Sequence, residues 1–185
     1  MIIPIKNGAY ATILKSPYSN GKMARSSTNN FFTPIKNVMI KAIFNTNNSY
    51  APLVLRILLA LVLMPHGAQK LLGSFGGFGF DGSMDFFTQT MGLPWLVGLV
   101  IIILEFFGPI ALLLGYLTRP VSLALTFLML GIIFTSSIQH GFWMNWFGTQ
   151  KGEGCEYFIL YIAGTLSLLI SGGGRLAIDR YFSRN

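Results

Sequence analysis

Long apolar runs, separated by short polar or glycine-rich stretches, dominate the chain after residue 50. A run of about 20 apolar residues is long enough to cross a hydrocarbon core of about 30 Å as an α-helix. The pattern predicts four such spans: Leu53–Leu72, Trp95–Leu117, Pro120–Gln139, and Tyr157 to about Ile178. The fourth is the least regular, because its apolar run stops at Ile170. We therefore expect an all-α membrane protein, built as a four-transmembrane-helix bundle.

The segment before the first span has a different composition. Residues 1–50 are rich in Ser, Asn, Thr and Lys and lack a sustained apolar period, which is typical of disordered chain. We predict a disordered basic N-terminal tail over 1–50, a four-helix transmembrane domain over 51–180 and a short cytoplasmic C-terminal tail over 181–185. Met23 and Met39 leave open a downstream start.

Composition agrees with a membrane protein: 52% of residues are hydrophobic, 10% are charged and the mean hydropathy is +0.59. The net charge of +7 does not indicate nucleic-acid binding, because six of the thirteen Lys and Arg residues precede the first span, without acidic residues among them. Positive charge beside a span marks the cytoplasmic side. Arg119, between the second and third spans, and three arginines after the fourth predict that both termini lie inside. Trp95, Trp143 and Trp146 then form an outer aromatic belt.

Two ionisable residues lie within the predicted spans, Arg56 in the first and Glu105 in the second, and His140 follows the third. Glu105 is about ten residues, or about 15 Å, from either end of its span, so burying it costs at least about 2.5 kcal/mol unless it is paired or protonated. We expect Glu105 to exchange protons or to form an ion pair with Arg56. By helical rise, Arg56 lies about 10 to 14 Å nearer the cytoplasm, so the pair needs an extended side chain or a tilted helix.

Four further residues are candidates for binding a cofactor: His66, Lys70, His140 and Glu156. Lys70 is near a helix end, where it could instead extend to the membrane surface. Small and polar residues on each predicted helix face also suit close packing and interhelical hydrogen bonds rather than chemistry. No metal site is predicted, and no iron-sulfur, flavin or zinc motif is visible. The single cysteine, Cys155, excludes an internal disulfide.

A set of ordered landmarks resembles the DoxX family of small four-helix membrane proteins, over Leu53 to Asp179. The landmarks are Arg56, His66-Gly67-Ala68-Gln69-Lys70-Leu71, Gly92-Leu93-Pro94, Glu105-Phe106-Phe107-Gly108, Thr118-Arg119-Pro120, Glu156 and Gly172-Gly173-Gly174-Arg175-Leu176-Ala177-Ile178-Asp179. Ala177 departs from the family pattern, which often has Ser there. The resemblance implies a multi-pass protein of the bacterial inner membrane. It also implies a link to redox enzymes, because the family takes its name from a subunit of a quinone-linked thiosulfate oxidoreductase.

Two functions follow from this reading. In the first, the chain is a subunit or accessory of a membrane oxidoreductase whose bundle admits a quinone, with Glu105 exchanging protons and Arg56, His66 or Lys70 stabilising a reduced oxygen. Haem between His66 and His140 is a less favoured variant. In the second, the chain is a non-catalytic assembly partner of a redox enzyme, or a carrier of a small solute. The sequence leaves both open.

Overall fold

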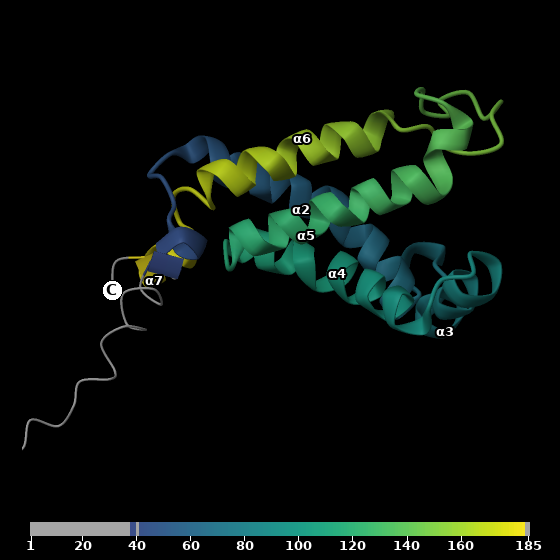
Figure 1. Ribbon diagram of the computed structural model, residues 1–185, viewed down its shortest axis with the longest axis horizontal. Helices are drawn as coiled ribbons and strands as arrows, with labels where there is room; N and C mark the ends of the chain where they lie inside the picture. The colour runs from purple at the N-terminus through teal and green to yellow at the C-terminus, as the bar shows by residue number, and fades with distance from the viewer. Residues whose placement is uncertain (1–37, 40, 184–185) are drawn as a thin grey trace, which may run out of the picture.

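The computed structural model describes residues 38–39 and 41–183, and the regular structure in that part is helical throughout (Figure 1). Most of the predicted N-terminal tail lies outside the described residues. The elements are α2 (Tyr50–Leu72), η1 (Ser74–Gly76), α3 (Gly79–Asp85), η2 (Phe86–Thr90), α4 (Trp95–Leu114), α5 (Thr118–Ile132), η3 (Ile133–Ser137), η4 (Ile138–His140), α6 (Glu156–Ser171) and α7 (Asp179–Ser183).

Three helical stretches are long and apolar enough to cross a membrane: α2, α4, and the run Thr118–His140 that comprises α5, η3 and η4. The α6 helix is apolar but has only 16 residues, or about 24 Å at 1.5 Å per residue. The prediction of an all-helical membrane protein is confirmed. The fourth predicted span is shorter than expected.

Glycines end the helices earlier than the apolar runs suggested. The α4 helix ends at Leu114, because Gly115 adopts a left-handed conformation with a φ of 66°. The α6 helix ends at Ser171, before Gly172 with a φ of 74°. Residues with a β-carbon rarely adopt such angles, so glycine at this position is a strong stop signal. The chain after each glycine is therefore free to turn back over the helix ends.

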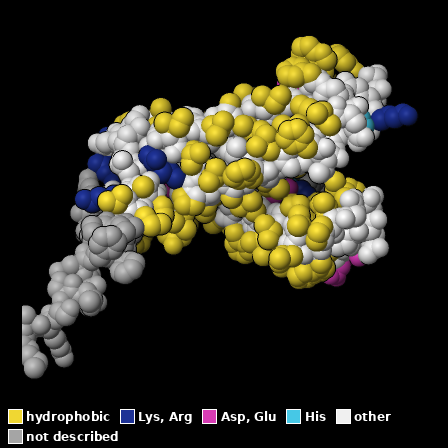
Figure 2. Space-filling view, in the orientation of Figure 1, with side chains coloured by type: hydrophobic (Ala, Val, Ile, Leu, Met, Phe, Trp, Pro, Cys, Tyr) yellow, Lys and Arg dark blue, Asp and Glu magenta, His cyan; other side chains and the backbone are white. Residues whose placement is uncertain are grey.

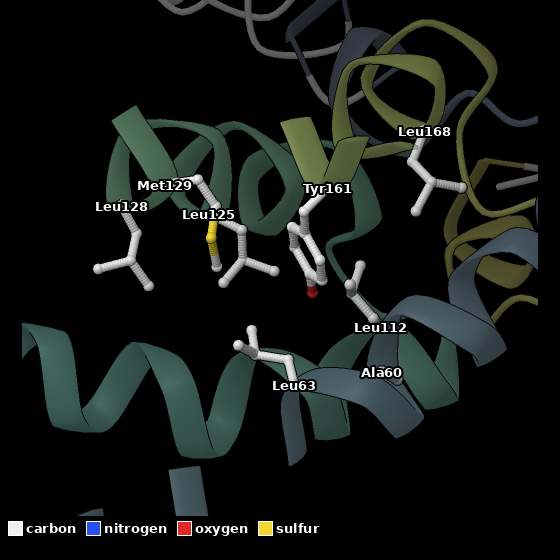
Figure 3. Packing of buried hydrophobic residues seen from close by; sticks show 8 residues of the cluster. All are labelled: Ala60, Leu63, Leu112, Leu125, Leu128, Met129, Tyr161 and Leu168. Carbon is white, nitrogen blue, oxygen red and sulfur yellow. The ribbon is translucent and has the colours of Figure 1, made fainter. Parts of the chain in front are cut away.

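The four long helices form two pairs, α2 with α4 and α5 with α6, which contact each other less extensively. In Figure 1 the pairs are close together at the end marked by α7 and diverge toward the end marked by α3. We call these the α7 end and the α3 end. Side chains from all four helices meet between the pairs and form the core (Figure 3): Ala60, Leu63, Leu112, Leu125, Leu128, Met129, Tyr161 and Leu168. The two helix pairs therefore contact each other through this core.

Candidate functional site

A large cavity of about 1010 Å³ lies between the two helix pairs. Figure 2 shows it as a cleft that opens between the two arms of the molecule, with acidic and basic side-chain atoms at its base. Its walls are mostly apolar and come from α2, α4, α5 and α6. Mostly apolar walls with a few convergent polar groups are typical of small-molecule sites. The polar groups in this cavity include His66, Lys70, Glu105, Ser136 and Tyr157.

An ion pair between Lys70 and Glu105 lies on the cavity wall, which Glu153 of the 141–154 loop also borders. Lys70 lies in the last turn of α2, and its ammonium donates a hydrogen bond to the Glu105 carboxylate. The Glu105 side chain is 3% exposed, whereas that of Lys70 is 30% exposed. A buried carboxylate is tolerated in a membrane when a cation neutralises it. Glu105 is therefore a paired acid on the wall of an apolar cavity.

The close approach of α2 to α4 makes this pair possible. Gly67 lies directly against the backbone of Glu105 and Phe106, where no β-carbon would fit. Since side chains three residues apart on a helix lie on the same face, Gly67 brings Lys70 over Glu105. Pro109, one turn later in α4, has no backbone N–H, so the Glu105 carbonyl lacks its usual helical hydrogen bond.

Tyr157, in the first turn of α6, adds a free hydroxyl to the cavity. The oxygen is buried but has no hydrogen-bond partner among the described residues. Buried polar groups are nearly always hydrogen-bonded, so an exception on a cavity wall indicates a place for a ligand or water. Tyr157 was not among the site residues predicted from the sequence. The signal was available, because Tyr157 and Tyr161 are polar aromatics one turn apart in an apolar run.

Two π-helical segments border the cavity, η2 at Phe86–Thr90 and η3 at Ile133–Ser137. In η3 the hydroxyl of Ser136 donates to the Ile132 carbonyl at 2.9 Å, four residues earlier. π-Helical turns within α-helices are frequent at functional sites, because the wider turn changes the direction of the side chains. Here the widened turn places Ser136 on the cavity wall.

Arg56 lies elsewhere, and the expected ion pair with Glu105 is not formed. Gly67, which touches Glu105, is about 16 Å farther along α2 than Arg56. The guanidinium instead donates to carbonyls in the last turn of α4 and in the segment that follows α6. Its acceptors are the carbonyls of Gly173 at 3.0 Å, Leu112 at 2.7 Å, Leu176 at 3.2 Å, and Leu113.

These contacts give Arg56 a structural position. The segment 172–178 has no regular helix, and each carbonyl buried there without a donor would cost about 1–3 kcal/mol. Arg56 is 2% exposed and satisfies two carbonyls of this segment together with two of α4. The expected pair is not formed because Arg56 lies about 16 Å along α2 from the level of Glu105. At that place backbone carbonyls bind the guanidinium, and the carboxylate that acts on it electrostatically is that of Asp179.

Asp179 completes the α7 end. Its carboxylate accepts from the backbone N–H groups of Leu117 at 2.7 Å and Thr118 at 2.8 Å, at the start of α5. Leu117 has a positive φ of 49°, which costs energy for a residue with a β-carbon. Asp179, 1% exposed, holds this strained turn and ties α7 to it. The sequence analysis did not name Asp179 as a site residue.

The remaining candidates divide between the cavity and the loop at the α3 end. His66 borders the cavity, but His140 does not. His140 lies in η4 and packs against Gly152, where a β-carbon would come 2.5 Å from its Nε2. The Glu156 carboxylate accepts from the backbone N–H of Met144 at 3.3 Å and so supports the 141–154 loop. The structure thus brings His66, Lys70 and Glu105 to one cavity, and leaves Arg56, His140 and Glu156 outside it.

Comparison with known proteins identifies the family of this chain. The DoxX family profile matches residues 51–137. The inner membrane protein YphA of Escherichia coli K12 is 30% identical over 132 residues, which cover 69% of this chain and 87% of that protein. The chain belongs to the DoxX family. No solved structure matches it. The DoxX match includes Lys70, Glu105 and the cavity walls on α2 and α4, whereas Tyr157 lies outside it.

Two more relatives match this chain over most of their own length. "Putative oxidoreductase CatD" of Bacillus subtilis 168 is 26% identical over 137 residues, 74% of this chain and 90% of CatD. The inner membrane protein YqjF of Escherichia coli K12 is 30% identical over 134 residues, 71% of this chain and 92% of YqjF. Family membership and the three candidate spans together identify a multi-pass DoxX membrane protein.

Proposed function

We propose that this DoxX protein is a subunit or accessory of a quinone-linked membrane oxidoreductase, and that the quinone binds in the large cavity. The observation that carries the proposal is the Lys70–Glu105 ion pair on the wall of a mostly apolar cavity. A quinone likewise combines a polar and an apolar part, with carbonyl oxygens at one end and an apolar tail at the other.

The cavity offers partners for both ends. Lys70 and the Tyr157 hydroxyl can donate to the carbonyl oxygens, and the Tyr157 hydroxyl has no competing partner among the described residues. Val100 on α4 and Phe127 on α5 line the cavity and are also 52% and 65% exposed on the apolar surface. A ligand dissolved in the bilayer therefore has lateral access between α4 and α5, and its tail can extend to the lipid.

The chemistry uses the ion pair as a proton store. A quinone that gains two electrons and two protons becomes a quinol, and the oxygens that accept the protons lie at its polar end. Glu105 and Lys70 are the groups that can hold and transfer protons there. The electrons come from a partner redox enzyme. The name of one relative, "Putative oxidoreductase CatD", supports this class of reaction.

We also propose that α6 and the segment 172–178 together complete a fourth crossing, and that the α7 end faces the cytoplasm of a bacterial inner membrane. The half-buried Arg119 and the exposed Arg175 lie at that end, whereas the acidic Asp81 and Asp85 lie at the other. Positive charge at the inner face supports this orientation. The names of YphA and YqjF support the inner membrane.

The alternative of a small-solute carrier or a non-catalytic assembly partner has less support. A carrier of anions needs an unpaired cation in its cavity, but Lys70 is already neutralised by Glu105. An assembly partner has no need of a cavity of about 1010 Å³ with an unpartnered hydroxyl.

Binding of a short-tailed quinone to the purified protein in lipid nanodiscs tests the proposal. We expect saturable binding, and at least a tenfold rise in Kd for Lys70→Gln, because a hydrogen bond from a charged donor contributes about 1.5–3 kcal/mol. Lys151→Gln is the matched control, since that lysine is exposed and does not border the cavity. Equal Kd values for the two variants, or no saturable binding by the native protein, would overturn the proposal.

A further inference from the structure

A second, smaller cavity of about 260 Å³ lies beside the first, at the α3 end. We infer that this cavity is an aqueous vestibule, and that Lys70 carries protons across its wall between the vestibule water and Glu105. The inference rests on the proposed function in one respect: the protons are used to protonate the quinone. It assigns Lys70 the role of proton relay and fixes the side of the membrane from which protons come.

Lys70 is the shared ionisable residue of the two cavities. The vestibule is lined by Gln69, Lys70, Gly76, Gly77, Phe78, Ser83, Phe86 and Phe87, and the large cavity also includes Lys70, Phe86 and Phe87. The two phenylalanines therefore form an apolar partition, and the lysine is the polar group set into it. A proton that crosses this partition has Lys70 as its carrier.

The two cavities differ in what they open to. The vestibule borders the 73–79 loop, where Gly76 and Phe78 are exposed at the end of the bundle. Its polar share is also larger, because Gln69 and Ser83 contribute amide and hydroxyl groups. The large cavity instead borders exposed apolar side chains between α4 and α5. Water thus has access through the vestibule, and an apolar ligand has access through the lipid side.

The loop that forms the vestibule is held in place by close packing. Gly77 lies against the backbone of Gln69, where a β-carbon would come 2.3 Å from the carbonyl oxygen. The Gln69 amide donates to the Phe75 carbonyl at 3.3 Å. These contacts keep the loop beside the last turn of α2, so the vestibule is a built feature of the fold.

Glu105 needs such a relay because its side chain is only 3% exposed. Transfer of a proton from the Lys70 ammonium to the Glu105 carboxylate leaves a neutral amine and a carboxylic acid. A hydronium ion in the vestibule water then returns a proton to the amine and becomes water, and the acid is ready to protonate a ligand oxygen. The other titratable groups that line the large cavity are His66, Glu153 and Tyr157, and none of them lines the vestibule.

Cysteine labelling tests the vestibule without any substrate. In a Cys155→Ser background, Ser83→Cys places a thiol of nearly the same size on the vestibule wall. A membrane-impermeant cationic methanethiosulfonate should modify it from the α3-end side of oriented vesicles, at least tenfold faster than Leu160→Cys on the exposed apolar face of α6. Gln69→Cys is a second reporter in the same cavity.

Failure of both thiols to react, or reaction only from the α7-end side, would overturn the vestibule. This outcome is independent of the proposed function. If the thiols react but no quinone binds, then the vestibule stands and the quinone proposal fails.

An acid jump followed by infrared spectroscopy tests the relay itself. The carboxylic acid band of Glu105, identified by its loss in Glu105→Gln, should appear at least tenfold more slowly in Lys70→Arg. Arginine keeps the positive charge and the ion pair but does not release a proton. His66→Gln should leave the rate unchanged. A native rate in Lys70→Arg, or a slow rate in His66→Gln alone, would contradict the role of Lys70.

Discussion

Gly67 on α2 lies so close to Glu105 on α4 that a β-carbon on Gly67 would come 2.2 Å from the Glu105 carbonyl oxygen. The two helices therefore touch through their backbones at the level of the buried acid. This contact fixes the height of Lys70 relative to Glu105, and hence the ion pair on which the cavity chemistry depends.

Gly67→Ala should push α2 and α4 apart and destabilise the protein. Overpacking of a tight interface costs about 1–3 kcal/mol, and the obstacle here is backbone that cannot rotate away. SDS-induced unfolding in mixed micelles measures the change. Gly131→Ala in α5 is the matched control, because its β-carbon would meet no atom within 4 Å. Equal loss of stability in both variants would contradict the close contact.

The two tyrosines of α6 should respond in opposite ways to loss of their hydroxyls. Tyr161→Phe should lower the free energy of unfolding by about 0.5–1.5 kcal/mol, because its hydroxyl donates to the Leu59 carbonyl at 3.2 Å. Tyr157→Phe should leave stability unchanged or raise it, because its hydroxyl has no partner in the described part of the chain. Quinone binding should weaken only in Tyr157→Phe. The reverse pattern would remove Tyr157 from the proposed site.

The ion-pair assignment predicts energetic coupling between Lys70 and Glu105. In a double-mutant cycle with Lys70→Gln and Glu105→Gln, the combined change should cost at least 0.5 kcal/mol less than the sum of the single changes. Arg56→Lys combined with Glu105→Gln should be additive within about 0.5 kcal/mol, because these residues do not meet. Coupling in the second cycle and not in the first would show that the pairing is wrong.

Arg56→Lys should itself be strongly destabilising, although it conserves the charge. A lysine ammonium is a point charge and cannot reproduce a planar fork that reaches the carbonyls of Gly173, Leu112, Leu113 and Leu176. Each buried carbonyl left without a donor costs about 1–3 kcal/mol. Thermal unfolding of the purified variant measures the loss, with Arg175→Lys on the exposed surface as control. Similar melting temperatures for the two variants would contradict the structural role.

The first three spans could be read from the sequence, because long apolar runs record the cost of exposing polar backbone to lipid. The helix ends at Gly115 and Gly172 were placed too late, because the apolar runs continue past or near them. The special position of Glu105 could be read for the same reason as the spans. Its partner could not, because helical rise gives the heights of Arg56 and Lys70 but not the contact at Gly67 that registers α2 against α4. Hydroxyl pairing was equally hidden: Tyr157 and Tyr161 look alike in the sequence and differ only in what surrounds them.

Photo-crosslinking with an azido-quinone tests the central claim most directly, because it reports where the ligand lies. The account predicts crosslinks to peptides from α2, α4 and α5 that carry His66, Val100 and Phe127, and competition by excess unlabelled quinone. Crosslinks confined to the exposed apolar surface of α6, such as Leu160 and Ile170, or crosslinks that unlabelled quinone does not reduce, would contradict it.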